Sequence, residues 1–430
     1  MHKILNYLKG IFISKSSFTA NVLTLVMGIS VSQIIPILAL LVLTRIYSPQ
    51  HFGIFAIYTS VVSAIAVIST GGYEFAVMLP DKDEDALNIV VAILIICFFI
   101  SSISFIILGV FNIPIAKMLG NSEISFFLYL VPLMVFPFGA YQAFYYWLNR
   151  KKEYKKITIN KIIQALFTAA ALITMGFMGF GAGGLIYGGI AGQLLASTIM
   201  GCQIWKENKG QKVMLDYNYA KKLLKRYRGF PRYALPTNFI NTIAIQIPTV
   251  LLNNFFGSLI VGFFGLTQRV FQTPISLISL SVRDVFIERA SSDYRNKGSC
   301  TDIFLKTFKG MSFFSFVLFL IVFLTGPILF SVVFGNGWRL AGRFAQILSP
   351  VLFLRMLIVP LGNVFNVIEK QKIDLFFNIY MLVSTVMVLF LSYYFLKKVE
   401  YVLVVFSINL VLIYIVYLFF AYTYSKKINR

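Results

Sequence analysis

Charged side chains are scarce in this chain. Asp, Glu, Lys and Arg together make up 13% of its 430 residues, whereas hydrophobic residues make up 58%. Because a soluble domain carries about 25% charged residues, this composition excludes a large soluble domain and therefore a soluble catalytic domain. The composition is typical of a protein that lies mostly in lipid.

Cysteine and histidine are also rare. The three cysteines, Cys97, Cys202 and Cys300, are far apart in the sequence, and there are only two histidines. We therefore expect neither a disulfide framework nor a metal site. The sequence has no glycine-rich loop of the kind that holds nucleotide phosphates, and no nucleophile at catalytic spacing from a base. We expect no cofactor and no enzymatic activity, which leaves transport driven by a gradient.

Acidic residues are few as well: 16 Asp and Glu stand against 38 Lys and Arg, and the net charge is +22. A nucleic-acid-binding protein gathers such charge on one face of a soluble domain, so we expect no nucleic-acid partner. The chain consists instead of apolar runs of about 20 residues, the length that crosses a bilayer as a helix. These runs predict an all-α polytopic membrane protein with about twelve transmembrane helices. The predicted spans are 18–44, 54–79, 87–111, 124–148, 158–178, 183–205, 233–257, 259–287, 307–334, 341–367, 373–396 and 400–425.

The Lys and Arg residues fall mostly in every second gap between the predicted spans. Of the 38, 27 lie in the two ends of the chain and in the gaps on their side, and 6 lie in the opposite gaps. Cytoplasmic loops of membrane proteins collect Lys and Arg, so we predict that the richer side, with both termini, is cytoplasmic. The acidic turn at 81–85 is an exception, but acidic residues have little weight in this rule.

The longest gap, 206–232, divides the spans into two sets of six. We predict an N-terminal lobe at 18–205 and a C-terminal lobe at 233–430. The gap is strongly basic, which predicts a cytoplasmic linker that lies on anionic membrane lipids. Residues 1–17 combine lysines with apolar residues at helical spacing, which predicts an interfacial N-terminal helix.

The two halves of the chain resemble each other weakly. An Ile-Pro pair at 35–36 precedes a leucine-rich run and Gly53, and a second Ile-Pro pair at 247–248 precedes two leucines and Gly262. Six-helix halves of equal orientation would be related by an axis along the membrane normal. This pattern predicts pseudo-symmetric lobes, and chance similarity in so apolar a sequence is the alternative.

Two arginines fall in the predicted membrane interior. Arg269 and Arg355 are each at least ten residues from either end of a predicted span, which is about 15 Å along a helix and close to the bilayer midplane. A charge at that depth costs at least about 2.5 kcal/mol, so it must face a hydrated cavity or a partner. We predict that both arginines bind an anionic cargo in a cavity. The alternative is structural pairing with helix carbonyls or with a buried acid.

Three further cations are weaker candidates for the substrate site. Arg283 lies next to Asp284 at the cytoplasmic end of the eighth span, where an ion pair and a side chain that reaches the interface are a sufficient explanation. Lys161 lies just inside the fifth span, and reaching toward the interface is its alternative as well. Arg45 lies at the outer end of the first span, where it either lines a periplasmic rim or marks the boundary of the span.

Glu74 is the acid that lies well inside a predicted span of the first half. It either binds a coupling cation or proton, or forms an ion pair with a basic group such as Lys161. Four glutamines within spans are further polar candidates, which could contact sugar hydroxyls in a hydrated cavity or hydrogen-bond between helices. These glutamines are Gln33, Gln142, Gln246 and Gln268.

Six short motifs are spread along the chain. They are LTRIYSPQHFG at 43–53, YALPT at 233–237, RVFQTP at 269–274, FGNGW at 334–338, QILSP at 346–350 and EKQK at 369–372. In their order and spacing, these motifs resemble those of polysaccharide transporters of the multidrug/oligosaccharidyl-lipid/polysaccharide exporter superfamily, in particular Wzx-type O-antigen flippases. The resemblance covers nearly the whole chain.

The resemblance implies two six-helix lobes around a central cavity that opens alternately to the two sides of the membrane. It implies a short oligosaccharide on undecaprenyl pyrophosphate as cargo, moved from the cytoplasmic to the periplasmic leaflet of the bacterial inner membrane for O-antigen or a related surface polysaccharide. The anionic pyrophosphate agrees with Arg269 and Arg355, which match the cationic lumens of the family by span and depth. Polysaccharide polymerase and chain-length proteins are implied as further partners.

Two other functions compete with a flippase. A drug or cation exporter of the same superfamily would need acidic or aromatic groups deep in its cavity, and the deepest charges in this sequence are positive. A membrane-bound glycan polymerase or ligase would need a large periplasmic loop, and no outward gap in this sequence is long enough. A flippase for lipid-linked oligosaccharides is therefore the main hypothesis.

Overall fold

The structure is a computed structural model, and it describes residues 17–208 and 217–426. The predicted interfacial helix at 1–17, apart from its last residue, and the middle of the predicted linker lie outside the described residues. Within those two ranges the chain forms helices and no strand, which confirms the all-α prediction.

The helices fall into two groups in chain order, separated by the short helix α10 (Tyr217–Arg226). The first group consists of α2 (Ser17–Ile46), α3 (Pro49–Ser69), η1 (Tyr73–Met78), α4 (Asp83–Val110), α5 (Asn112–Met118), α6 (Ile124–Leu128), α7 (Val131–Arg150), α8 (Tyr154–Phe177) and α9 (Ala182–Glu207). The second group consists of η2 (Phe230–Ala234), α11 (Leu235–Phe256), α12 (Ser258–Pro274), η3 (Ile275–Ser279), α13 (Leu280–Lys297), α14 (Thr301–Phe334), η4 (Asn336–Trp338), α15 (Arg339–Leu361), α16 (Val364–Val367), α17 (Gln371–Leu396) and α18 (Val399–Ser425).

Most of these helices are long and apolar. Among the described residues, 11 helical runs are long and apolar enough to cross a membrane, and the described apolar part of α2, Ser30–Ile46, is a shorter one. The protein is therefore a multi-pass membrane protein. Each of the twelve predicted spans falls largely on helical residues, although several of them extend over more than one element.

The second span differs most from its prediction. Helix α3 begins at Pro49, because Ser48, just before the helix, and His51, in its first turn, form a capping box. The helix ends at Ser69 rather than near residue 79. The cause of the early end is a pair of glycines, Gly71 and Gly72, with φ of +62° and +76°. These left-handed conformations end a helix, so the following residues form the short helix η1 instead of a continuation of the span.

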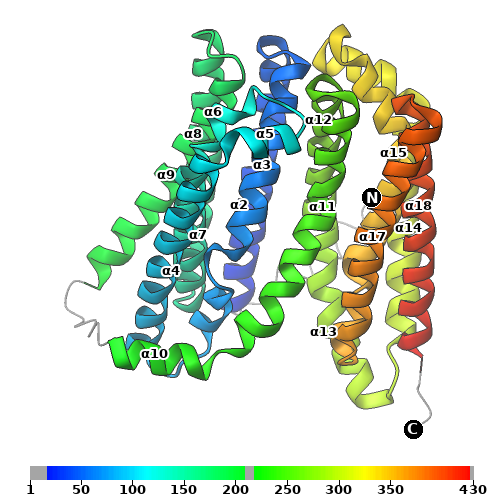
Figure 1. Cartoon of the computed structure of the whole chain (residues 1–430). Coiled ribbons are helices and arrows are strands. Elements are labelled where there is room, and N and C mark those ends of the chain that lie inside the picture. The colour runs from blue at the N-terminus through cyan, green and yellow to red at the C-terminus, as the bar shows by residue number, and fades with distance from the viewer. Residues whose placement is uncertain (1–16, 209–216, 427–430) are drawn as a thin grey trace.

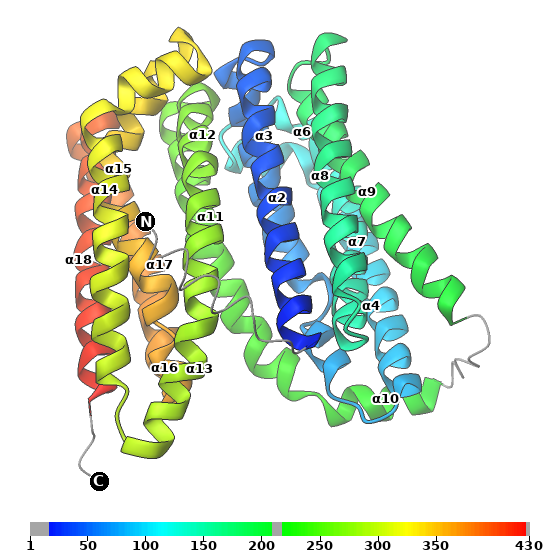
Figure 2. The same ribbon diagram turned by 180° about the vertical axis from the view of Figure 1, so that it is seen from behind.

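The two groups stand side by side, and α10 lies across one end of the molecule (Figures 1 and 2). We call the end with α10 the inner end, because the gaps predicted to be cytoplasmic lie there, and the opposite end the outer end. Helices α3 and α12 pack closely against each other and join the groups. The boundaries of the two lobes and their pseudo-symmetry stay predictions.

The groups meet tightly at the outer end. A Cβ atom on Gly53 would lie 1.8 Å from the carbonyl oxygen of Ser258, and one on Gly262 would lie 1.7 Å from the carbonyl oxygen of Pro49. The indole Nε1 of Trp338 donates a hydrogen bond of 2.9 Å to the carbonyl oxygen of Thr44. Backbone contact between α3 and α12 therefore depends on glycine at two positions, and a tryptophan of the second group is bonded to the first.

At the inner end, α10 is fastened to the first group. The hydroxyl of Tyr219 donates to the carboxylate of Asp85 at 2.5 Å, which raises the pKa of that hydroxyl, and the hydroxyl of Tyr73 donates to the carbonyl oxygen of Leu224 at 3.3 Å. Leu223 is buried. The acidic turn at 81–85, the exception to the distribution of Lys and Arg, thus has a local role, since its Asp85 carboxylate accepts a hydrogen bond from α10. Contact of the basic face of α10 with anionic lipid stays a prediction.

Candidate functional site

A cavity of about 560 Å³ lies between α2, α7, α8, α9 and α12. We call it the cationic cavity, because Arg269 and Lys161 both line it. Its other polar lining residues carry hydroxyls and amides: Ser32, Gln33, Tyr141, Gln142, Gln164, Thr168, Gln193, Gln272 and Thr273. No carboxylate is among these lining residues, so the cavity is positively charged.

Arg269 lies on α12, within the predicted eighth span, and it is half-buried. Its guanidinium group lies over the ring of Phe55, at 4.4 Å from the centroid, and 5.7 Å from the ring of Phe52. Within the described ranges it forms no ion pair with an acid. Two aromatic faces stabilise a cation by about 0.5–2 kcal/mol each, which supports the group while leaving its charge available to an anion.

Lys161 lies on α8 and is also half-buried. Its ammonium group lies 4.9 Å from the centroid of the Tyr145 ring, and among the residues that the structure describes it has no carboxylate partner. The two cations come from different walls of the cavity, one from each helix group.

The amides of the cavity form a short hydrogen-bonded chain. The Nε2 of Gln164 donates to the Oε1 of Gln193 at 2.8 Å, and the Nε2 of Gln193 donates to the carbonyl oxygen of Pro137 at 3.3 Å. Sequence reasoning missed both glutamines, although each lies inside an apolar helix and was detectable by that criterion. These two hydrogen bonds fix the orientation of the Gln193 side chain, so this part of the cavity wall is polar and ordered.

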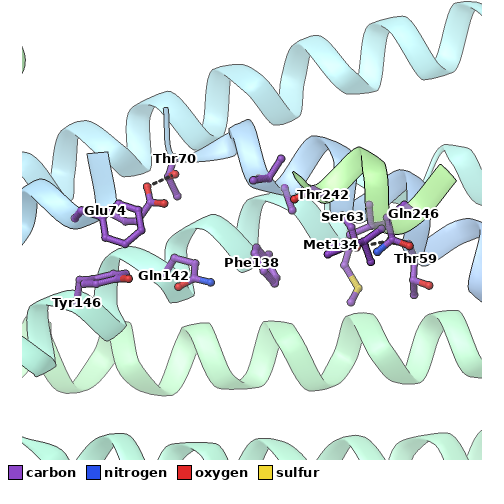
Figure 3. Close-up of a pocket in the computed structure, with 15 residues that line it drawn as sticks. Thr59, Ser63, Thr70, Glu74, Met134, Phe138, Gln142, Tyr146, Thr242 and Gln246 are labelled. Carbon is purple, nitrogen blue, oxygen red and sulfur yellow. Dashed lines mark hydrogen bonds between the residues drawn. The ribbon is translucent and has the colours of Figure 1, made fainter. Parts of the chain in front are cut away.

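A second cavity, of about 450 Å³, lies between α3, η1, α7 and α11 and is shown in Figure 3. We call it the Glu74 cavity, because Glu74 is the charged residue in its lining. Phe138 and Gln142 line both this cavity and the cationic one, so the two adjoin. The predicted ion pair of Glu74 with Lys161 is not formed. Instead, the Oε2 of Glu74 accepts a hydrogen bond of 2.5 Å from the hydroxyl of Thr70.

Arg355 lies elsewhere, in a third cavity of about 280 Å³ lined from α11, α12, α15, α17 and α18. Asp374 lines the same cavity and accepts a hydrogen bond of 2.8 Å from the hydroxyl of Tyr417. The expectation that Arg269 and Arg355 share one cavity is therefore wrong. Depth along a helix does not fix the direction in which a side chain points, and Arg355 points toward α17 and α18.

The two remaining cationic candidates lie outside all three cavities. Arg283 forms an ion pair of 3.0 Å with Asp284, which is the local explanation that the sequence offered. Arg45 is exposed and donates to the carbonyl oxygen of Leu41. Of the predicted substrate-binding residues, the structure brings together only Arg269 and Lys161.

The predicted glutamines divide among the cavities. Gln33 and Gln142 line the cationic cavity, Gln142 and Gln246 line the Glu74 cavity, and Gln268 lines the cavity of Arg355. A glutamine can both face a cavity and form a hydrogen bond between helices. Gln246 lines a cavity and also accepts a hydrogen bond of 3.0 Å from the hydroxyl of Ser60 on a neighbouring helix.

Comparison with known proteins places this geometry in context. A family model described as "Polysaccharide biosynthesis protein" matches residues 42–342. The amylovoran biosynthesis protein AmsL of Erwinia amylovora is 22% identical to this chain over 279 residues, which are 64% of this chain and 69% of the relative.

Solved structures share the fold. A multidrug resistance MATE family transporter of the MOP superfamily, in an inward-facing conformation, superposes with a TM-score of 0.74 at 14% identity, covering 91% of this chain and 94% of the other. The lipid II flippase MurJ, in an inward closed conformation, superposes with a TM-score of 0.70 at 13% identity, covering 93% of this chain and 87% of the other. At these identities the likeness concerns the fold alone.

Proposed function

This chain belongs to the polysaccharide biosynthesis protein family, and we propose that it is a flippase for lipid-linked oligosaccharides. Its cargo would be an oligosaccharide repeat unit on undecaprenyl pyrophosphate, carried from the cytoplasmic to the periplasmic leaflet of the inner membrane for O-antigen or a related surface polysaccharide. The polyprenyl tail stays in lipid while the headgroup crosses. Polymerase and chain-length proteins of the same pathway are the proposed partners.

The observation that carries this proposal is the pair of unpaired cations in one amide-lined cavity. Arg269 and Lys161 both line it, and neither has a carboxylate partner within the described ranges. A guanidinium group forms strong, bidentate hydrogen bonds with phosphate oxygens, and burial away from bulk water strengthens them. A pyrophosphate in this cavity would replace the missing counter-ion and offset the cost of the buried charges.

Export of cationic drugs fits this cavity poorly. A cationic cargo needs acidic groups on the walls, and the cavity presents two positive charges and no carboxylate among its lining residues. Arg355 and Asp374 line the third cavity, which contains neither Arg269 nor Lys161, although Ile245 lines both it and the Glu74 cavity. We therefore assign the pyrophosphate to Arg269 and Lys161 alone. Glu74 stays a candidate for binding the coupling ion.

The test is transport by the wild-type chain and by the variants Arg269→Ala and Lys161→Ala. Each should lower the rate of translocation of undecaprenyl-pyrophosphate-linked oligosaccharide in proteoliposomes by about 10- to 100-fold, the effect of losing a charged hydrogen bond. Arg289→Ala, which removes an exposed arginine outside the three cavities, is the matched control and should transport like the wild type.

Protein abundance in the membrane must be equal for all variants, so that loss of transport is not loss of protein. Wild-type rates in both cavity variants would overturn the assignment of the pyrophosphate to Arg269 and Lys161. A wild-type chain that moves no lipid-linked oligosaccharide would overturn the proposed function itself.

A further inference from the structure

We propose that the Glu74 cavity is the subsite that binds the sugar part of the cargo, with Glu74 as a specificity-determining residue. This inference rests on the proposed function. The cationic cavity accounts for the pyrophosphate, but an oligosaccharide headgroup is much larger than its phosphates and needs a second binding surface within reach of them.

The position of the Glu74 cavity meets this need. Phe138 and Gln142 form part of the wall of both cavities, so the two binding surfaces lie next to each other. A volume of about 450 Å³ lies within the usual range of ligand sites, about 300–1,000 Å³. Both cavities lie between the helix groups, since α11 and α12 of the second group close them against helices of the first.

The charges of the two cavities divide the cargo between them. Lys161 and Arg269 line the first, whereas no Lys or Arg lines the second, whose charged residue is the carboxylate of Glu74. A pyrophosphate is repelled by a carboxylate and attracted by the two cations. A neutral sugar carries many hydroxyl donors, which a carboxylate accepts in strong hydrogen bonds. The headgroup would therefore bind with its phosphates in the cationic cavity and its sugars beside Glu74.

The side chains of the Glu74 cavity suit a sugar in detail. Figure 3 shows Glu74, Thr70, Gln142 and Tyr146 gathered at one end and Thr59, Ser63 and Gln246 at the other, with Phe138 between them. One carboxylate oxygen of Glu74 accepts from Thr70, and the other has no hydrogen-bond partner among the described residues. The Oε1 of Gln246 accepts from Ser60, which leaves its amide donors for the cavity.

An aromatic wall completes the subsite. The rings of Phe75 and Tyr146 meet edge to face at 5.3 Å, and Phe75 stacks on Phe230 at 6.1 Å. Phe75 and Tyr146 both line the cavity. One face of a sugar ring is formed largely by C–H groups, which pack favourably on aromatic rings, while its hydroxyls remain at the edge. Polar groups at two ends and aromatic rings beside them are the surface that an oligosaccharide needs.

The experiment compares two ligands, free undecaprenyl pyrophosphate and the lipid-linked oligosaccharide extracted from cells that lack this transporter. Binding of each to the purified full chain is measured at equilibrium without an ion gradient, so gradient-driven transport does not contribute. The variant Glu74→Gln keeps the shape of the side chain and a hydrogen-bond acceptor for Thr70 but removes the charge.

Glu74→Gln should bind the lipid-linked oligosaccharide about fivefold more weakly, the difference between a charged and a neutral hydrogen bond. It should bind free undecaprenyl pyrophosphate as tightly as the wild type, or more tightly, because a repelling charge is gone. Phe75→Leu, which removes the aromatic wall, should show the same selective loss. Arg269→Ala should weaken the binding of both ligands.

The two proposals fail in different ways. If Glu74→Gln and Phe75→Leu bind both ligands like the wild type, or weaken both equally, the sugar subsite is wrong while the effect of Arg269→Ala still stands. If Arg269→Ala binds both ligands like the wild type, the pyrophosphate site is wrong, whatever the other variants do.

Discussion

The guanidinium group of Arg269 is both charged and planar, and both properties matter for its contact with the Phe55 ring. Its guanidinium group lies 4.4 Å from the centroid of the Phe55 ring, an arrangement that favours a planar group over an ammonium group. The variant Arg269→Lys keeps the charge but loses the stacking and the bidentate fork. We expect it to transport at an intermediate rate, about tenfold below the wild type and above Arg269→Ala.

The same proteoliposome assay measures this rate. A matched variant, Phe55→Leu, removes the ring and leaves the arginine, and it should lower the rate by less than Arg269→Lys does, since cation–π contact contributes about 0.5–2 kcal/mol. Equal rates for Arg269→Lys and the wild type would mean that only the charge matters, and that the planar shape of the guanidinium group has no role in transport.

The helices that carry the two buried arginines could be predicted from the sequence, and the directions of their side chains could not. Arg269 lies on α12 and Arg355 on α15, each within a predicted apolar span, and their depth in the membrane stays a prediction. The cavity that each one faces depends on how helices rotate and pack against one another, which a single sequence does not reveal. Glu74 was misplaced for another reason: apolar residues resume at 75–79 after Gly71 and Gly72, so the two runs were joined into one span and the end of α3 was missed.

At the scale of the helices, the contact of α3 with α12 makes a sharp prediction. A methyl group at Gly53 would lie 1.8 Å from a backbone oxygen of Ser258, and backbone cannot move aside as a flexible side chain can. We expect Gly53→Ala to force the outer ends of the two groups apart and to lower transport to background. Alanine ordinarily stabilises a helix by about 0.5–1 kcal/mol relative to glycine, so destabilisation by this variant would report the lost contact.

The control is Gly310→Ala on α14, where an added methyl group meets nothing within 4 Å. Spin labels on cysteines at Ser122 and Arg339, one on each group at the outer end, measure the separation by double electron–electron resonance. Gly53→Ala should shift the distances to larger values and Gly310→Ala should not. Identical distance distributions and transport rates in the two variants would show that the contact accommodates a methyl group at Gly53, and the prediction would be wrong.

The weak similarity between the two halves of the sequence includes both glycines of the contact between α3 and α12. Gly53 and Gly262, which follow the two Ile-Pro pairs, lie on the helices that touch, and each fits against the backbone of the other helix. In the sequence, the two glycines belong to the pattern that predicted two similar halves. That they would face each other across the boundary of the groups depends on the docking of those groups, which local sequence does not encode.

For the whole molecule, composition and hydropathy were sufficient to predict the fold class, and the motifs were sufficient to predict the family. The basic gap predicted where the chain passes from one helix group to the other, and α10 lies there. The sequence could not predict that the outer ends meet in this structure, because under the proposed function the chain must encode both an outward-closed and an outward-open arrangement. The contacts of Gly53, Gly262 and Trp338 define one of them.

The orientation of the molecule in the membrane is a prediction of the charge distribution. The 27 Lys and Arg on one side against 6 on the other place α10 in the cytoplasm and the loop between α5 and α6 in the periplasm. We expect a cysteine at Ser122 to react with a membrane-impermeant maleimide in intact spheroplasts, and a cysteine at Lys222 to react only after the membrane is permeabilised. Both side chains are exposed, so access is set by the membrane alone.

The labelling uses a chain in which Cys202 is replaced by serine, because Cys202 is exposed whereas Cys97 and Cys300 are buried. The opposite labelling pattern, in which Lys222→Cys reacts from outside, would show that the molecule has the inverse orientation in the membrane. Arg269 and Lys161 would keep their depth in that case, since inversion does not move the middle of the membrane. The closed outer end would then face the cytoplasm.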